Sequence, residues 1–187
     1  MKTKILTFLF ASLLITINIS AQENNTSEKF GSALNIGIGA GYYGYVGYSI
    51  PVLHANYEFD IEKNLTLAPF VTIYTYEKDY FWDNKNYPSK YYFYRVTVIP
   101  IGVKGSYYFN QLLNANSKWD FYASGSAGFA IRNVNWESGF YGDKSIEHGS
   151  SRLYLDIHIG SEYHLNNKLG LFLDLSSGIS TLGLAVH

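Results

Sequence analysis

The chain has 187 residues, a formal net charge of −1 at pH 7, and 16% charged residues against 18% aromatic ones. A water-soluble domain carries about 25% charged residues, so the surface of this protein is short of charge. The near-neutral balance gives no support to nucleic-acid binding. The absence of cysteine excludes a lipid-modified lipoprotein, a disulfide scaffold and a thiolate metal site.

Residues 1–21 have the three parts of a cleaved export signal. Lys2 and Lys4 precede an apolar run, and small residues end the segment. The run is short for a membrane-spanning helix of about 20 residues, and no basic stop-transfer cluster follows it. We expect a signal peptide at 1–21, a periplasmic tail at 22–31 and one barrel domain at 32–187.

The mature chain contains eight amphipathic segments of strand type, with no helical pattern between them. In chain order they are 34–43, 52–61, 65–76, 94–109, 121–132, 152–165, 169–176 and 180–187. An even number of such strands joined by turns is typical of a closed antiparallel barrel. We therefore predict an all-β, eight-stranded, antiparallel up-and-down barrel.

The connections between these strands are uneven. Those at 62–64, 110–117 and 166–168 are compact, whereas those at 77–91 and 134–151 are long. Outer-membrane barrels have short turns on the periplasmic side and longer loops outside the cell. The pattern predicts a transmembrane barrel with both termini in the periplasm.

Alternation alone does not say which face of each strand points outward. The stretch HANYEFD, residues 54–60, has one polar and one apolar face. The lumen of an eight-stranded barrel has room for side chains only, and glycine and serine are concentrated on the polar faces. The polar faces should therefore point inward, and the bulky aliphatic side chains should contact lipid.

The fourth strand loses its alternation at Pro100. Val96 and Val98 are in phase with each other, but beyond the proline the apolar residues Ile101 and Val103 occupy the opposite phase. Proline cannot donate a hydrogen bond to a strand ladder and is found at bulges. We predict a β-bulge at Ile99-Pro100.

Aromatic residues gather at both ends of the strands, which is typical of the two girdles of a membrane barrel. The alternative is that tyrosine is simply a good strand former. The expected girdle residues are Tyr42, Tyr43, Tyr45, Tyr48, Tyr74, Tyr76, Tyr91, Tyr92 and Tyr94 at the loop ends, and Phe59, Tyr107, Tyr108, Phe109 and Trp119 at the turn ends.

Three segments resemble known proteins: the export signal ending in ISAQ, the stretch IPIGVKGSYYF and the closing LGLFLDLSSGISTLGLAVH. They are similar to small eight-stranded outer-membrane β-barrel proteins of the OmpX, OmpW and OmpA-transmembrane-domain kind, in a style common in Bacteroidetes. The resemblance implies an integral outer-membrane monomer in contact with lipid and lipopolysaccharide, inserted by the barrel-assembly machinery. Barrels of this group usually end in an aromatic residue, whereas this chain ends in Val186-His187.

Charged and histidine side chains of both signs fall on the inward faces. The expected polar network of the lumen consists of His54, Glu58, Asp60, Arg95, Lys104, Arg132, Asp156, His158, Glu162 and Asp174, with His164 in the same phase. Unpaired charge is costly in a narrow, low-dielectric space, so we expect mutual pairing that plugs the barrel. A gated path for small solutes is the alternative.

Some eight-stranded barrels are lipid-modifying enzymes that use a histidine with a serine. The histidines here fall within a filled lumen, so we expect no catalytic residue, and without clustered spacing no metal ligand or cofactor is predicted.

The two long connections mix aromatic and charged residues. Phe81, Trp82, Trp136, Phe140 and Tyr141 are the expected surface-contact residues. Binding an extracellular ligand and merely capping the barrel mouth against lipopolysaccharide sugars are equally compatible with this composition. We predict a structural, envelope-integrity or surface-contact protein, with a small-solute channel second and a lipid-modifying enzyme third.

Overall fold

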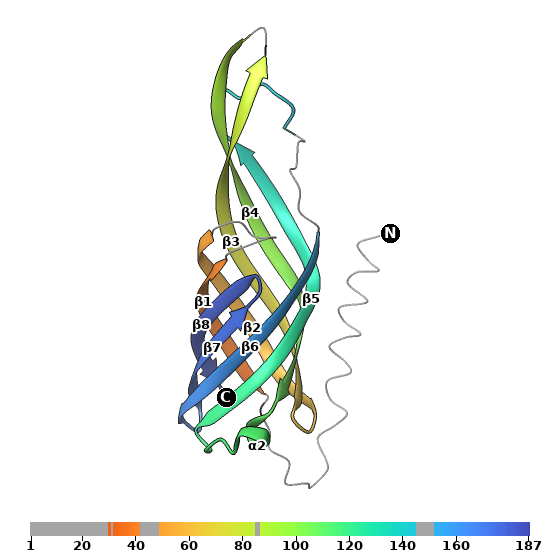
Figure 1. The fold of residues 1–187 in the computed structure, drawn as a ribbon, viewed down its shortest axis with the longest axis vertical. Helices are drawn as coiled ribbons and strands as arrows, with labels where there is room; N and C mark the ends of the chain where they lie inside the picture. Colours follow the sequence, from red (N-terminus) through yellow and green to blue (C-terminus); the bar gives the residue numbers. More distant parts are fainter. Residues whose placement is uncertain (1–29, 31, 42–48, 85–86, 145–151) are drawn as a thin grey trace.

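The structure is a computed structural model that describes residues 30, 32–41, 49–84, 87–144 and 152–187. Within these residues, eight strands form one closed barrel in sequence order (Figure 1). The predicted signal peptide lies outside the described residues, as do Tyr42, Tyr43, Tyr45 and Tyr48 of the predicted girdle.

Each strand pairs antiparallel with its neighbours in sequence, and the first strand closes the barrel on the last. The strands are β1 (Ala33–Gly41), β2 (Ser49–Glu62), β3 (Leu65–Asn84), β4 (Tyr87–Tyr108), β5 (Trp119–Trp136), β6 (Leu153–Asn166), β7 (Leu169–Ser176) and β8 (Ile179–Val186). A single helical turn, α2 (Asn110–Leu113), connects β4 to β5. The predicted all-β, eight-stranded antiparallel up-and-down barrel is confirmed.

The exterior of the barrel is apolar. Aliphatic and aromatic side chains on every strand point away from the lumen, and Ile157 and Phe129 are 75% and 71% exposed. Such a surface on a closed barrel, in which every strand is hydrogen-bonded to two neighbours, matches the hydrocarbon region of a bilayer. Among the described residues, no helix is long and apolar enough to cross a membrane.

Three strands continue far beyond the others at one end of the barrel. β3, β4 and β5 have 20, 22 and 18 residues, whereas β7 and β8 have 8 each. A barrel strand crosses a bilayer with about 9–11 residues. The β3–β4 hairpin therefore projects past the membrane, at the end opposite to α2 and the short turns (Figure 1), which is the extracellular end in outer-membrane barrels.

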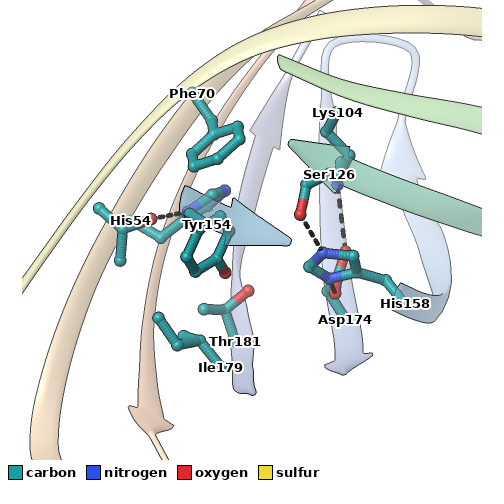
Figure 2. Close-up of a pocket in the computed structure, with 10 residues that line it drawn as sticks. His54, Phe70, Lys104, Ser126, Tyr154, His158, Asp174, Ile179 and Thr181 are labelled. Carbon is teal, nitrogen blue, oxygen red and sulfur yellow. Dashed lines mark hydrogen bonds and ion pairs between the residues drawn. The ribbon is translucent and has the colours of Figure 1, made fainter. Parts of the chain in front are cut away.

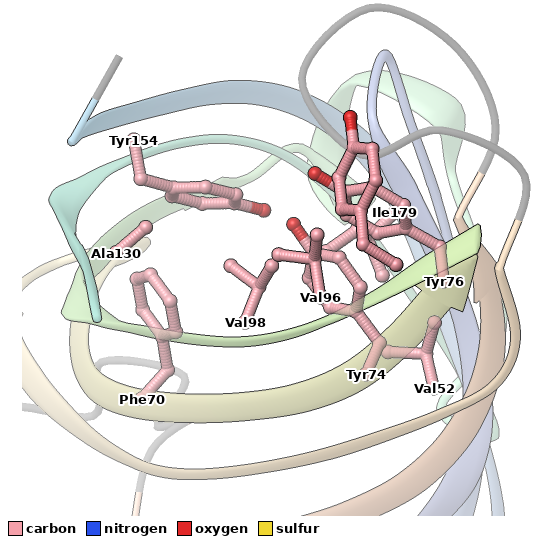
Figure 3. Close-up of a cluster of buried hydrophobic side chains, with 10 residues drawn as sticks. Val52, Phe70, Tyr74, Tyr76, Val96, Val98, Ala130, Tyr154 and Ile179 are labelled. Atoms are coloured by element: carbon pink, nitrogen blue, oxygen red, sulfur yellow. The ribbon is translucent and has the colours of Figure 1, made fainter. Parts of the chain in front are cut away.

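The extracellular half of the lumen is filled by tyrosine and valine rather than by small residues. Figure 3 shows this cluster: Val52, Phe70, Tyr74, Tyr76, Tyr94, Val96, Val98, Ala130, Tyr154 and Ile179. The girdle prediction is wrong for Tyr74, Tyr76, Tyr92, Tyr94 and Tyr108, which are all buried. Tyr107 and Trp119 do lie on the exterior, 50% and 39% exposed. The inward phase of β3 includes Tyr74 and Tyr76, but alternation does not predict the size of the inward side chains.

Glycine on a neighbouring strand makes room for large inward side chains. A Cβ atom on Gly160 would overlap the Tyr122 ring, and one on Gly170 would overlap the Glu162 carboxylate. A lumen that holds only side chains can therefore accept large ones where a facing position has none. This pairing of glycine with a bulky partner allows Tyr122 and Glu162 to reach across adjacent strands.

The predicted bulge at Ile99-Pro100 is wrong. β4 pairs with β5 without interruption through Ile99–Ile131 and Pro100–Ala130. On the other side, the β3 ladder keeps the same register from Val71–Ile101 to Tyr74–Val98. The phase of the strand never slips; the polarity of its inward face changes instead, from Val96 and Val98 in the aromatic layer to Lys104 and Ser106 below it.

Candidate functional site in the lumen and at the barrel mouth

Most of the predicted polar network lies inside the barrel. Glu58, Lys104, Asp156, Glu162 and Asp174 are buried, each at 3–6% exposure, and His54, Arg132 and His158 are partly buried. They come from five strands, β2, β4, β5, β6 and β7, so barrel closure alone brings them together. Asp60 is exposed at the turn end, where its Oδ1 accepts a hydrogen bond of 3.0 Å from the Phe30 backbone N–H.

The prediction that Arg95 belongs to this network is wrong. Arg95 is exposed on the outer face of the β3–β4 extension, and its guanidinium lies 2.5 Å from the Glu77 carboxylate across the hairpin. The cause is the misread phase of β4: with no bulge at Pro100, Val96 and Val98 point inward and Arg95 points outward.

Asp174 on β7 is the centre of the polar cluster shown in Figure 2. Its Oδ2 lies 3.1 Å from Lys104 Nζ. The same oxygen accepts a hydrogen bond of 3.0 Å from the Tyr122 hydroxyl. Its Oδ1 lies 2.6 Å from His158 Nδ1. The Lys104 ammonium also lies over the Tyr122 ring, 5.1 Å from its centre. Four strands are therefore joined through one carboxylate.

Asp156 on β6 forms a second anchor near the extracellular side. It accepts hydrogen bonds from the Tyr154 hydroxyl at 3.1 Å and from the hydroxyls of Ser176 and Ser177 at 2.9 and 2.6 Å. The Ile179 backbone N–H donates to it at 3.3 Å. A buried carboxylate with this many donors is satisfied without a cation, and it fixes the β7–β8 turn to β6.

His54 on β2 lies across the lumen from Asp174. Its Nδ1 is 2.7 Å from the Thr72 hydroxyl, and its Nε2 is 2.9 Å from the Asn56 amide nitrogen. Both ring nitrogens therefore have neutral partners. This arrangement is that of a structural histidine.

The arrangement of Ser126, His158 and Asp174 is that of a serine–histidine–aspartate triad, in which the two ring nitrogens of the histidine face the serine and the aspartate. Ser126 Oγ lies 2.9 Å from His158 Nε2, and His158 Nδ1 lies 2.6 Å from Asp174 Oδ1. The cavity beside them has a volume of about 10 Å³, which is room for about one water molecule. Asp174 is also bound to Lys104 and Tyr122. The cavity beside the serine therefore has no space for an acyl group.

A third polar cluster lies at the periplasmic mouth, below the Tyr108–Tyr122 layer. Glu58 binds the hydroxyls of Thr66 and Tyr108, the latter at 2.8 Å. Glu162 Oε1 lies 2.7 Å from His187 Nε2 and 3.6 Å from His164 Nδ1. We refer to Glu162, His164 and His187 as the mouth cluster.

Sequence reasoning missed Tyr108, Tyr122, Ser126 and His187 as network members. The first three have the inward phase of their strands, so alternation could have identified them. His187 follows β8 and lies beside Glu162 only because β6, β7 and β8 are neighbours in the barrel. No local sequence signal marks that proximity.

The predicted surface residues divide into two groups. Phe81 and Tyr141 are 50% and 75% exposed. Phe140 is buried: its ring stacks on Trp136 at 4.1 Å and meets Trp82 edge to face at 5.5 Å. The expectation that Phe140 is a surface contact is therefore wrong, because this side chain forms the core of the extracellular extension.

No protein-family model matches the chain, and no curated protein sequence does so either. Among solved structures, the chain is similar to the outer-membrane protein Ail of Yersinia pestis in a bilayer nanodisc, with 12% identity, a TM-score of 0.44, and coverage of 83% of this chain and 97% of Ail. It is also similar to Ail in complex with the heparin analogue sucrose octasulfate, with 8% identity, a TM-score of 0.45, and coverage of 84% and 99%. Neisserial surface protein A is a third, with 16% identity, a TM-score of 0.43, and coverage of 82% and 92%.

The localisation follows from the barrel itself. A closed eight-stranded sheet with an apolar exterior, a side-chain-filled lumen and long strands at one end is the architecture of outer-membrane proteins. The protein is an integral outer-membrane β-barrel protein.

Proposed function

We propose that this outer-membrane barrel is closed to solutes and acts as a contact protein of the cell surface. In this role the barrel anchors a rigid extracellular platform made of the β3–β4 hairpin and the end of β5. The observation that carries the proposal is the aromatic core inside that platform.

The core of the platform joins three strands beyond the membrane. Phe140 follows β5 and contacts Tyr80 and Trp82 of β3, Tyr92 of β4 and Trp136 of β5 at ring-centre distances of 4.1–5.9 Å. Each aromatic pair contributes about 0.5–1.5 kcal/mol beyond its area burial. A hairpin that only capped the barrel would not need a hydrophobic core of its own above the membrane.

The outer face of the platform has the composition of a recognition surface. Phe81 and Tyr91 form a tilted pair 4.9 Å apart and are 50% and 67% exposed. On the opposite face of β4, Lys90 forms an ion pair with Glu137 at 3.3 Å, and its ammonium lies 4.8 Å from the centre of the Tyr92 ring. Exposed aromatic side chains held on a rigid support lose little conformational entropy on binding, which favours contact with a macromolecular partner.

The closed lumen supports contact rather than transport. The aromatic layer, the Asp174 cluster and the Tyr108–Tyr122 layer follow one another along the barrel axis, and the cavity at the Asp174 cluster measures about 10 Å³. A conducting path would require the Lys104–Asp174 pair to separate inside a low-dielectric space, which is costly.

Two measurements test the proposal. In planar bilayers, the purified protein should give no steady single-channel openings. Regular openings would contradict the proposal and would support a transport function instead. On whole cells, the triple variant F81S/Y91S/Y141S should bind extracellular-matrix or sugar-coated surfaces at least tenfold less than the parent.

The matched control for the binding assay is L112S/L113S. These two leucines are 77% and 54% exposed in α2, at the opposite end of the barrel. The control should bind like the parent. If the parent and the triple variant are present at the surface in equal amounts and bind equally well, the proposed contact function is contradicted.

A further inference from the structure

The mouth cluster brings together three side chains of the kind that bind transition metals. One ligand atom from each of Glu162, His164 and His187 lies within 4.8 Å of the other two. The side chains are 7%, 24% and 19% exposed, so the site is shielded yet open to the periplasmic side. We infer that the mouth cluster is a binding site for a divalent transition-metal ion of the Zn²⁺ type.

The barrel register explains why these residues meet. His164 pairs with Gly170 on β7, and Gly170 pairs with Ala185 on β8, two residues before His187. The Glu162 side chain occupies the space where a Gly170 side chain would be. A glycine in the middle strand thus allows the carboxylate of β6 to reach across β7 to the imidazole that follows β8. The backbone N–H of His187 donates to the Lys168 carbonyl at 3.0 Å, which holds that residue in place.

Each group has one nitrogen or oxygen available for a metal. His187 Nε2 and His164 Nδ1 both face Glu162 Oε1, at 2.7 and 3.6 Å. Zinc binds histidine nitrogen and carboxylate oxygen at about 2.0–2.2 Å, so neighbouring ligand atoms lie roughly 3.3 Å apart around a tetrahedral ion. The observed distances from Glu162 Oε1, 2.7 Å to His187 Nε2 and 3.6 Å to His164 Nδ1, lie on either side of that value. Small side-chain rotations would therefore admit the ion, which would displace the hydrogen bond between His187 and Glu162.

A second carboxylate orients one of the ligands. His164 Nε2 lies 2.7 Å from Asp120 Oδ2, and Asp120 Oδ1 accepts a hydrogen bond of 2.5 Å from the Asn110 amide. Metal-binding histidine usually donates its other ring N–H to a carboxylate in this way, which fixes the tautomer and ring orientation. Asp120 therefore presents His164 Nδ1 to the site.

The donor set selects the class of metal. Two imidazoles and one carboxylate suit Zn²⁺ and related transition ions, whereas Mg²⁺ and Ca²⁺ prefer oxygen ligands alone. Three protein ligands leave a fourth position for water. A bound ion would link the end of β8 to β6 across β7, close to the β1–β8 seam. This site is separate from the contact platform, which lies at the other end of the barrel.

Zn²⁺ binding to the whole refolded protein in detergent micelles, treated first with a chelator, tests the site. Competition with a chromophoric chelator should show one tight Zn²⁺ per chain, and Co²⁺ should give the visible absorption of a tetrahedral nitrogen and oxygen site. Both signals should be lost in H187A and H164A. Asp120→Asn should weaken Zn²⁺ binding about tenfold to a hundredfold, because Asp120 only orients His164. Mg²⁺ and Ca²⁺ should not compete.

The matched control is H148A, which removes a histidine outside the described residues and should bind Zn²⁺ like the parent. Far-UV circular dichroism confirms that each variant is folded. In the unmodified protein, Zn²⁺ should protect His164 and His187 from diethyl pyrocarbonate, which tests the site without substitution. Zn²⁺ binding that is equal in the parent and H187A, or absence of protection, would overturn the inference.

Discussion

Replacing Asp174 with asparagine keeps the shape of the side chain and removes its charge. Lys104, whose side chain is 6% exposed, would then remain in the lumen without the carboxylate that lies 3.1 Å from its Nζ. Removing one partner of a buried ion pair costs about 3–5 kcal/mol. We expect Asp174→Asn to lower the free energy of unfolding by roughly that amount.

Removing the other partner, Lys104, should lower the free energy of unfolding by less, because Asp174 has other hydrogen-bond donors. In Lys104→Met, the carboxylate keeps the Tyr122 hydroxyl at 3.0 Å and His158 Nδ1 at 2.6 Å. The loss is then one hydrogen bond to a charged group, about 1.5–3 kcal/mol. The double variant should cost less than the sum of the single changes by about 1–3 kcal/mol, since the two residues are in contact.

Equilibrium urea unfolding in phospholipid vesicles, followed by tryptophan fluorescence, measures all four free energies. Equal costs for the two single changes, with additivity to within about 0.5 kcal/mol, would refute this reasoning, because the pair would then contribute no coupling in the lumen.

Three further changes test other parts of the structure. Gly160→Ala should destabilise the barrel by about 1–3 kcal/mol through overlap with the Tyr122 ring, whereas Gly125→Ala, whose added carbon meets no atom closer than 4.0 Å, should change little in the same unfolding assay. Phe140→Ala should speed limited proteolysis of the β3–β4 extension without moving the unfolding midpoint of the barrel, and unchanged cleavage would contradict the role of this ring as a core. The hydrogen bond to Glu162 raises the pKa of His187 above 6.5 in the folded protein. In chelator-treated protein its stabilisation should therefore be complete below pH 6.5 and decline as pH rises through the folded pKa, so the difference in unfolding free energy between the parent and H187Q should shrink as the pH is raised above 6.5.

The errors in the orientation of β4 have one common cause. Alternation predicts polar side chains inside and apolar ones outside, which places Val96 and Val98 outward and Arg95 inward. That rule fails in the extracellular half of the barrel, where valine and tyrosine fill the lumen. In the extension beyond the barrel, Arg95 lies outside in an ion pair with Glu77, and the stacked Trp136 and Phe140 rings lie inside. The same limit accounts for the girdle prediction at Tyr74 and Tyr94, whose side chains are buried in the lumen.

The sequence by itself determined the barrel, the number of strands and, within the bilayer, which side chains point to the lumen. These properties depend on the two-residue period of a strand and on the narrow interior of eight strands, and both are local or compositional. Only the tertiary structure decided the pairings: Lys104 with Asp174 across 70 positions of sequence, and Glu162 with His187 across 25. Such contacts depend on strand register and on which strands are neighbours in the closed ring. Neither property can be predicted from the sequence of a single strand.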